Sequence, residues 1–227
     1  PSYFDAWREE CRLADRIIVN SEWSREQVER AGVSRDKLVL VPLPFEVAES
    51  GFTRTYPGSF SPARPLRVLF VGSVATFKGV PSLLEALDAL DDLDIEIRLV
   101  GPIAATIPDR FLRDRRVRLL GPRSRSEVMT HYQDADVLVF PSQSDGFGMA
   151  QVEARGWRLP VIASPHAGRV IEDGVDGVVL PEVSAAAIAA AIRHVSDPGV
   201  LRRLASAPAR MHSLDAFGQA LVEAVRR

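Results

Sequence analysis

The sequence predicts a doubly wound α/β fold with a parallel sheet, preceded by one further β-α-β unit. From residue 66 onward, short apolar runs alternate with helical patterns. Each run is rich in β-branched residues or leucine and ends near Gly, Pro or Ser, as is typical of strands buried on both faces of a parallel sheet. Ligands of such folds bind at the carboxyl ends of the strands, so the residues that follow each strand are the first candidates for function.

The second part of the chain is expected to hold six strands, over residues 66–71, 95–100, 117–120, 137–140, 159–163 and 177–180. Helices are expected between them, over residues 80–90, 109–114, 126–134, 149–156 and 168–173. Three helical segments then close the chain. The first has Ser184 as its cap and apolar residues at helical spacing from Ile188 to Val195, the second carries Leu201 and Leu204, and the third spans residues 213–227.

The first fifty residues contain a single β-α-β unit after an initial helix. Strands at 16–20 and 37–41 enclose a helix at 21–31 that Ser21 can cap. Such a unit cannot close a core of its own. Residues 42–65 hold five prolines, which is typical of a linker. We therefore expect residues 1–50 to be the end of one α/β domain, 51–65 a linker, 66–212 a complete domain and 213–227 a closing helix.

Composition argues against several classes of protein. The 227 residues are 46% hydrophobic and 26% charged, as in ordinary globular domains. A net charge of −2 argues against nucleic-acid binding through bulk electrostatics. The apolar runs are too short to span a bilayer, and we expect neither a signal peptide nor a transmembrane helix. Cys11 is the single cysteine and the four histidines are scattered, so no disulfide and no metal site is expected in this chain, which we place in the cytoplasm.

The strand at residues 66–71 leads into the loop GSVATFKG, which spans residues 72–79 and opens a helix. A glycine turn with a lysine near a helix start can hold phosphate, because backbone amides and the helix dipole attract the anion and Lys78 adds a full charge. The loop matches neither the Walker A pattern nor G-x-G-x-x-G. The alternative is a solvated loop lysine. Lys78 and Lys37 are the only lysines in the sequence, and this scarcity favours a role for Lys78.

The strand at residues 137–140 leads into PSQSDGFG, where Asp145 precedes a glycine turn made of Gly146, Phe147 and Gly148. The successive amides of such a turn form a nest that receives anions. A helix is expected to begin directly after the turn.

Glu153 lies in this helix, four residues after Met149, and is expected to share its inward face with Met149, Val152 and Gly156. A carboxylate that faces inward is costly unless it is paired. The two hydroxyls of a sugar or ribose diol could donate hydrogen bonds to the Glu153 carboxylate. The alternative is a salt bridge to Arg155 or Arg158.

The run DGFGMAQVE, from Asp145 to Glu153, resembles the E-x7-E motif of glycosyltransferase family 4, a retaining group with the GT-B fold of two Rossmann-like domains. Four more segments resemble landmarks of that family in the expected order. They are LADRIIVNS (13–21), the glycine-lysine loop at 72–79, YQDADVLVFPS (132–142) and IEDGVDGVVLP (171–181). The resemblance covers nearly the whole chain. It implies a donor-binding carboxyl-terminal domain preceded by the last β-α-β unit of the amino-terminal domain, to which the closing helix crosses back.

The resemblance also implies roles for single residues. Lys78 would bind the donor's diphosphate and Asp145 would face the transferred sugar, and these two are the catalytic candidates. Glu153 would hold the ribose hydroxyls, and residues 121–123 would lie near the nucleobase. The expected donor-binding residues are Gly72, Ser73, Lys78, Arg123, Asp145, Gly146, Phe147, Gly148 and Glu153.

Two positions depart from the family's pattern. Ser73 stands where the family has a phosphate-binding arginine, which removes one positive charge; Arg123 or Arg125 could compensate. Asp145 stands in place of a glutamate and is one methylene shorter, which could change the preferred sugar.

Taken together, the resemblance implies the donor-binding half of a retaining glycosyltransferase that uses a UDP- or GDP-sugar, no metal and no other cofactor. The acceptor is a sugar, a lipid or another small molecule, in polysaccharide or glycolipid biosynthesis. Most of the amino-terminal domain is missing, so the chain as given is expected to be inactive, and the missing domain is where peripheral membrane association would arise. The alternatives are a non-catalytic nucleotide-sugar binding module, which Ser73 favours, and an inverting enzyme or epimerase of similar fold, which the Asp145–Glu153 pair disfavours.

Overall fold

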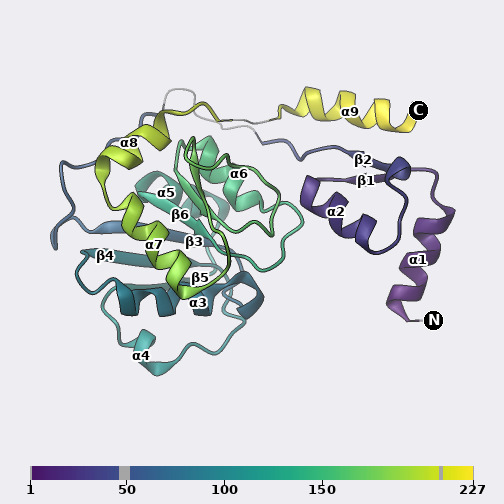
Figure 1. The fold of residues 1–227 in the computed structure, drawn as a ribbon. Coiled ribbons are helices and arrows are strands. Elements are labelled where there is room, and N and C mark those ends of the chain that lie inside the picture. The colour runs from purple at the N-terminus through teal and green to yellow at the C-terminus, as the bar shows by residue number, and fades with distance from the viewer. Residues whose placement is uncertain (1, 46–51, 210–211, 227) are drawn as a thin grey trace.

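The computed structural model of the chain describes residues 2–45, 52–209 and 212–226. These residues form two α/β units (Figure 1). The first unit, residues 2–45, contains a two-stranded sheet, and the second unit, residues 52–209, contains a six-stranded sheet. The α/β class expected from the sequence is confirmed.

The larger sheet is parallel throughout, with the strand order β5-β4-β3-β6-β7-β8. Its strands are β3 (Leu66–Val71), β4 (Ile95–Val100), β5 (Val117–Gly121), β6 (Val137–Phe140), β7 (Val161–Ala163) and β8 (Gly177–Val179). The chain builds the sheet outward from β3 in one direction and then returns to place β6 on the other side of β3. The neighbours β3 and β6 therefore define a topological switch point, beside which ligands bind in open α/β sheets.

Alternate residues of β3 enter different cores on the two faces of the sheet. Val68 and Phe70 belong to one apolar cluster, and Leu69 belongs to the other. All three side chains are almost fully buried. Since helices cover both faces, the strand has to be apolar along its length rather than alternating, which is the pattern read from the sequence.

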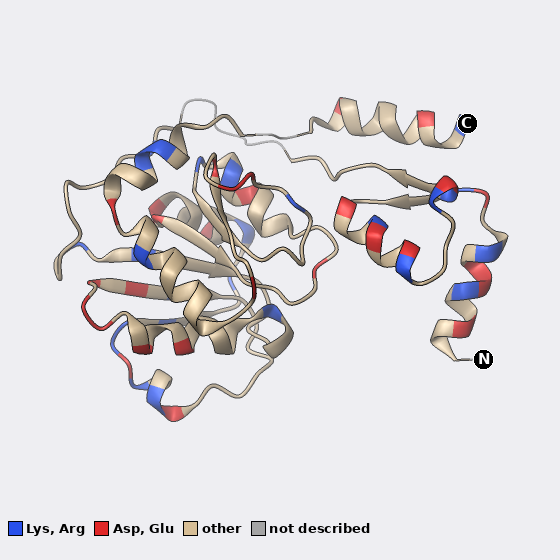
Figure 2. Ribbon diagram, in the orientation of Figure 1, with Lys and Arg blue, Asp and Glu red and all other residues tan. Residues whose placement is uncertain are grey.

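Helices cover both faces of the larger sheet. α3 (Val80–Glu85), α7 (Ala185–Val195) and α8 (Pro198–Ser206) supply apolar residues to the first cluster. α5 (Arg125–Asp134) and α6 (Met149–Gly156) supply residues to the second, and α4 (Asp109–Leu112) lies near β5. The helix expected at 80–90 is split, because a 3-10 turn, η3 (Ala86–Ala89), follows α3. α7 carries few charged residues (Figure 2), in keeping with its buried face.

The helix expected at residues 168–173 is wrong. The backbone there is committed to neighbouring loops instead of to a helical ladder. Gly168 N donates to Phe147 O at 3.2 Å, and Glu172 N donates to the Asp176 carboxylate at 2.7 Å. Arg169 has a φ of 45°, in the left-handed region that interrupts a right-handed helix.

The first unit has the expected elements. α1 (Tyr3–Leu13) precedes β1 (Ile17–Val19), α2 (Glu22–Arg30), η1 (Arg35–Lys37) and β2 (Leu38–Leu40), and β1 and β2 pair in parallel. Ser21 caps α2 by accepting a hydrogen bond from Ser24 N at 3.0 Å. The last helix, α9 (Leu214–Arg226), lies on the side of the molecule that holds α1 and α2 (Figure 1).

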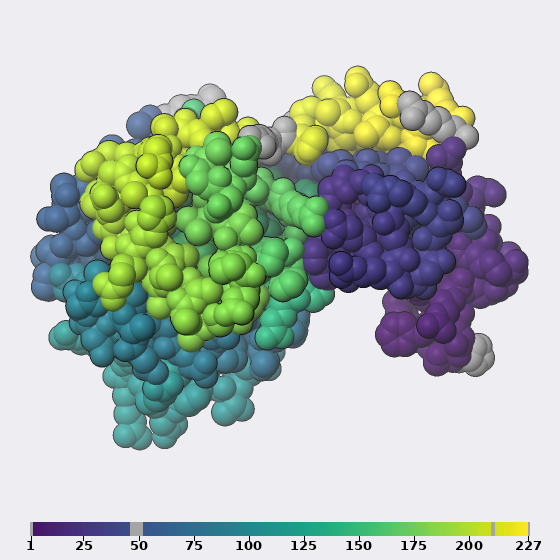
Figure 3. Space-filling view, in the orientation of Figure 1, coloured from purple at the N-terminus to yellow at the C-terminus, as the bar shows by residue number. Residues whose placement is uncertain are grey.

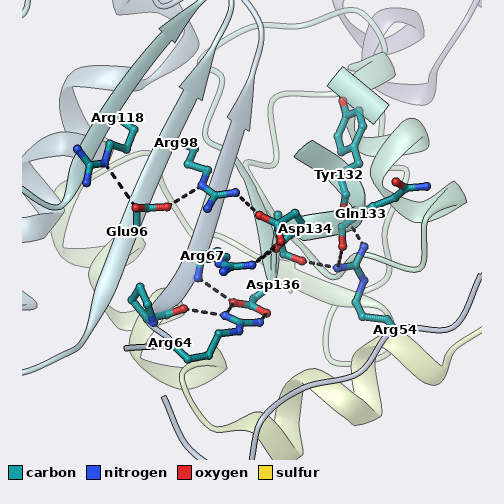
Figure 4. Close-up of polar contacts among 12 residues, drawn as sticks. Arg54, Arg64, Arg67, Glu96, Arg98, Arg118, Tyr132, Gln133, Asp134 and Asp136 are labelled. Carbon is teal, nitrogen blue, oxygen red and sulfur yellow. Dashed lines mark hydrogen bonds and ion pairs between the residues drawn. The ribbon is translucent and has the colours of Figure 1, made fainter. Parts of the chain in front are cut away.

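Residues 52–65, expected to be a linker, make close contacts with the second unit. Phe52 packs edge-on against Trp157, with ring centroids 5.3 Å apart. The Arg54 guanidinium donates to four carbonyls, among them Tyr132 O at 2.7 Å and Trp157 O at 3.0 Å. Arg64 forms a two-pronged ion pair with the buried Asp136, at 2.7 Å for each contact (Figure 4). The division between first domain and linker, expected at residues 50 and 51, lies outside the described residues, and the domain boundaries stay a prediction.

Candidate functional site

The loops that follow β3 and β6 are pressed together at the switch point. Gly79 ends the first loop with a φ of 73°, and a Cβ placed on it would lie 1.9 Å from Pro141 O in the second loop. Gln143 N also donates to Phe77 O at 2.8 Å. Glycine is therefore required at position 79 both for its backbone conformation and for the approach of the two loops.

This contact brings together Lys78 and Asp145, the two residues expected to be catalytic. The Lys78 ammonium forms an ion pair with Asp145 Oδ2, and both side chains are about four-fifths buried, at 18% and 19% exposure. The ammonium also lies 5.2 Å from the ring centroid of Phe77 and 5.8 Å from that of Phe140. Aromatic faces favour a cation in this position. The structure therefore does not support a solvated loop lysine at position 78.

The glycine turn after Asp145 is held from several sides. Phe147 N donates to Asp145 Oδ1 at 3.2 Å, so one of the amides expected to contact a ligand is directed at this carboxylate. Gly148 is the N-cap of α6 with a φ of 77°, and a Cβ there would lie 2.9 Å from the Phe140 ring. On the opposite side, the hydroxyls of Ser21 and Ser24 donate to Gly146 O, the latter at 2.8 Å.

The inward face expected for α6 is partly wrong. Val152 is buried as expected, but its buried companions are Gln151, Ala154 and Arg155, whereas Met149 and Gly156 are half-buried. Glu153 is half-buried too. Its Oε2 accepts a hydrogen bond of 2.7 Å from the Tyr132 hydroxyl on α5.

The alternative of a Glu153 salt bridge to Arg155 is wrong. Arg155 is almost fully buried, and its Nε lies 3.5 Å from Asp176 Oδ2, a carboxylate that is equally buried. A second guanidinium nitrogen donates to Ala207 O at 3.0 Å. Burial lowers the pKa of Arg155. Arg158 is exposed and has a φ of 54°, and within the described residues it makes no ion pair with Glu153.

A cavity of about 340 Å³ lies beside Glu153. Arg123 lines it as well, so the structure brings together two of the predicted donor-binding residues here. Arg125, which could compensate for Ser73, also lines it. The remaining lining residues were not proposed as site residues: Phe45, Val71, Val128, Met129, Tyr132 and Trp157. Residues 125, 129 and 132 follow i, i+4, i+7 spacing on α5, a sequence signal that could have identified this wall.

The other predicted residues lie at the end of β3. Gly72 has a φ of 144°, and its carbonyl oxygen lies 2.0 Å from the position that a Cβ on Gly101 would take. The loops after β3 and β4 are therefore also in close contact. Ser73 follows Gly72 and is half-buried. Arg123 lies 3.9 Å from Glu127, so its charge is partly balanced by the helix that follows it.

A second cavity, of about 250 Å³, lies between the first unit and the glycine turn. Ser21 and Leu40 line it from one side, and Phe147 and Arg169 line it from the other. An ion pair of 2.8 Å between Arg169 and Glu26 lies across the same junction. Figure 3 shows the green segment of the second unit meeting the purple first unit there. Sequence reasoning did not identify this cavity, because its two walls come from segments more than a hundred residues apart.

The part of the chain that the structure describes holds no group of three or more His, Cys, Asp or Glu side chains arranged to bind a metal ion. Metal independence stays a prediction. Among the described helices, none has both the length and the hydropathy that a membrane span requires.

The chain is similar to known proteins in sequence and in fold. A family model described as "Glycosyl transferases group 1" matches residues 65–197. The D-inositol 3-phosphate glycosyltransferase of Streptomyces bingchenggensis is 30% identical over 230 residues, which cover 90% of this chain and 50% of that protein. The protein of the same name from Geodermatophilus obscurus is 30% identical over 227 residues, covering 88% and 49%. The chain spans about half the length of the curated relatives it matches.

Solved structures share the fold. Sucrose-phosphate synthase from Thermosynechococcus elongatus superimposes with a TM-score of 0.76 at 23% identity, covering 96% of this chain and 60% of that chain. Anabaena HepE, solved in complex with UDP and glucose, superimposes with a TM-score of 0.77 at 19% identity, covering 99% and 67%.

Proposed function

Because this chain belongs to the group 1 glycosyl transferases, we propose that it forms the donor-binding half of an enzyme that transfers a sugar from a nucleoside diphosphate sugar to an acceptor with retention of configuration. One observation carries the proposal. Lys78 and Asp145 meet at the switch point of the sheet, where the fold class places its ligands.

In this proposal, Lys78 and the amides of the glycine turn bind the diphosphate of the donor. An ammonium and the amides at the start of α6 are suited to an anion, since they combine full charge with the positive end of a helix. A diphosphate would take over part of the contact that Lys78 makes with Asp145. Asp145 would then be free to accept hydroxyls of the transferred sugar.

The nucleoside would occupy the cavity beside Glu153. Its volume of about 340 Å³ lies at the lower end of the range usual for ligand sites. Glu153 would accept ribose hydroxyls there, and Arg123 would lie near the base. UDP is supported as one candidate because HepE was solved with UDP; GDP remains the other candidate that the resemblance implies.

In the proposed reaction the bond between the anomeric carbon and the diphosphate oxygen breaks, and the negative charge that develops on the leaving group is stabilised by Lys78 and the turn amides. The acceptor hydroxyl attacks from the face that the leaving group vacates and gives its proton to the departing diphosphate oxygen, so that the configuration is retained. No metal ion or cofactor is assigned to this step.

The acceptor and the setting are proposals as well. We propose a sugar, a lipid or another small molecule as the acceptor, in polysaccharide or glycolipid biosynthesis in the cytoplasm. Peripheral membrane association would depend on segments outside this chain. Family membership favours transfer over a non-catalytic nucleotide-sugar module.

Calorimetry tests the donor half of the proposal directly. We expect the 227-residue chain to bind UDP or GDP with a defined stoichiometry, and ADP serves as the third base in the panel. Inorganic pyrophosphate is the control that separates phosphate binding from nucleoside binding. Absence of heat with all three nucleotides at millimolar concentration would contradict the proposal.

A further inference from the structure

Tyr132 is a buried tyrosine whose hydroxyl points at a group in the candidate site. It lies on α5 with about 1% of its surface exposed. Its hydroxyl donates a hydrogen bond of 2.7 Å to Glu153 Oε2 on α6. Burial and the neighbouring Glu153 raise the pKa of Tyr132 well above the usual value, so the hydroxyl keeps its proton and remains a donor.

Both residues line the cavity of about 340 Å³. Tyr132 occupies one oxygen of the Glu153 carboxylate. For the other oxygen, Oε1, the residues that the structure describes supply no hydrogen-bond partner. Oε1 is therefore the oxygen that can accept a hydrogen bond from a hydroxyl of a bound molecule.

The helices that carry the pair are themselves held in place. The Arg54 guanidinium donates to Tyr132 O at 2.7 Å and Gln133 O at 3.2 Å, at the end of α5. It also donates to Trp157 O at 3.0 Å, directly after α6. Figure 4 shows Arg54 beside Tyr132 and Gln133. One half-buried cation thus sets the distance between α5 and α6, and the tyrosine hydroxyl sets the rotamer of Glu153.

We infer that Tyr132 is a positioning residue that holds the Glu153 carboxylate so that Oε1 faces the cavity and accepts a ribose hydroxyl of the nucleotide; this inference rests on the proposed function. A glutamate side chain has several rotamers, and ordering it on binding costs conformational entropy. The hydrogen bond from Tyr132 orders the carboxylate before the ligand arrives, which raises affinity for ligands that carry ribose hydroxyls.

A purely structural role for the pair makes a different prediction. If Glu153 only satisfies a buried tyrosine hydroxyl, removing that hydroxyl affects the fold and changes the affinity for every ligand alike. The two roles are separated by comparing the affinity for a ribonucleotide with the affinity for an analogue that lacks the ribose 2′ and 3′ hydroxyls. Only the positioning role acts through those hydroxyls.

The experiment compares UDP and GDP with their 2′,3′-dideoxy analogues by calorimetry. In Tyr132→Phe we expect affinity for the ribonucleotide that binds the parent to fall about tenfold, as for loss of a hydrogen bond that involves a charged group, and affinity for the dideoxy analogue to stay within twofold. Glu153→Gln should show the same selectivity. The double variant should add little to either change, because residues that act through one interaction are not additive.

Tyr56→Phe is the matched control. Tyr56 is a half-buried tyrosine, and its hydroxyl donates to Asp136 O at 3.2 Å, away from the cavity. It should leave the preference for ribose unchanged. Equal weakening of both ligands in Tyr132→Phe, or no change in either, overturns the inference while the proposed function stands. If the parent binds no nucleoside diphosphate, the proposed function fails first.

If Tyr132→Phe melts at too low a temperature to assay, Glu153→Asp tests the same inference. It draws the carboxylate back by one methylene from Tyr132, and a selective loss of ribonucleotide affinity is again expected. Retention of the parent's preference for ribose in this variant overturns the inference.

Discussion

Lys37 and Lys78, the two lysines of the sequence, have different uses. The Lys37 ammonium donates to the last carbonyls of α1 and the residue after it, at 2.8 Å for Arg12 O and 2.7 Å for Ala14 O. It therefore caps a helix carboxyl end, where a cation is favoured. Lys78 makes no such cap, because its partner is Asp145 at the switch point.

Replacing Lys78 tests its role in phosphate binding. A charge-assisted hydrogen bond contributes about 1.5–3 kcal/mol, so Lys78→Ala should weaken UDP or GDP binding roughly ten- to a hundredfold. Lys37→Ala is the control, since it removes the same charge from the first unit and should leave the affinity unchanged. Titration calorimetry measures both. Equal affinity of Lys78→Ala and the parent would refute the phosphate role.

Glu153→Gln tests whether this side chain is needed for binding or for folding. The amide oxygen of glutamine can still accept the Tyr132 hydrogen bond, so the melting temperature should shift by no more than a few degrees. Ribonucleotide affinity should nevertheless fall, because an amide is a weaker acceptor than a carboxylate. A large loss of stability with unchanged affinity would instead make Glu153 a structural residue.

At the scale of elements, the site depends on two loops whose backbones are in contact. Gly79 and Gly174 have almost the same positive φ, at 73° and 72°. Their surroundings differ. A Cβ on Gly79 would meet Pro141 O at 1.9 Å, whereas a Cβ on Gly174 would have nothing within 4 Å.

This pair of glycines separates backbone strain from loop packing. Gly174→Ala should cost only about 1 kcal/mol, the strain of a left-handed alanine. Gly79→Ala should cost roughly 1–3 kcal/mol more, because the loops must move apart, and it should also weaken nucleotide binding by displacing Lys78. Thermal melting and calorimetry on the two variants give the comparison. Equal melting temperatures would show that the loop contact is not needed.

A second feature of the element scale is the anchoring of α6. Arg155 is nearly fully buried and ties the helix to Asp176 and to Ala207 O. This helix carries Glu153, so the buried cation orients the site although it touches neither cavity. Breaking a buried ion pair by removing one partner leaves an uncompensated charge, which is strongly destabilising.

At the scale of the molecule, the described parts of the two units are joined by few polar contacts. Ser21 and Ser24 donate to Gly146 O, and an ion pair joins Glu26 to Arg169. Arg169 is 55% exposed and Glu26 is 33% exposed, so this pair contributes little. The first unit also exposes large apolar side chains, among them Tyr3, Leu13 and Ile18, as does α9 at Val222 and Val225.

Limited proteolysis combined with a transfer assay tests this arrangement. We expect cleavage within the first unit to leave a resistant core that begins near Phe52. A linker over residues 51–65 would place this start near Pro65, but Phe52, Arg54 and Arg64 are attached to the second unit. We also expect self-association through the exposed apolar residues and edge strands, and donor binding without transfer. Resistance from the first residue onward, or sugar transfer above the rate of donor hydrolysis, would contradict this expectation.

The sequence by itself determined where most elements lie and which residues follow the central strands. Residues 66–71, 95–100, 137–140 and 149–156 agree with β3, β4, β6 and α6 at both ends, because apolar runs and glycine turns are local signals. The glycine turn after residue 71 indicated Lys78 as a phosphate-binding candidate, and the resemblance to glycosyltransferase family 4 added Asp145.

The tertiary structure alone decided which partners these residues take. Lys78 and Asp145 are 67 positions apart, and Tyr132 and Glu153 are 21 apart. Arg155 forms its ion pair with Asp176 and not with its neighbour Glu153. The amide of Gly168 donates to Phe147 O instead of forming a helical hydrogen bond. No local pattern encodes such choices. They depend on how parallel strands register and how helices dock on them, and a buried charge or amide then pairs with whichever group that packing places within reach.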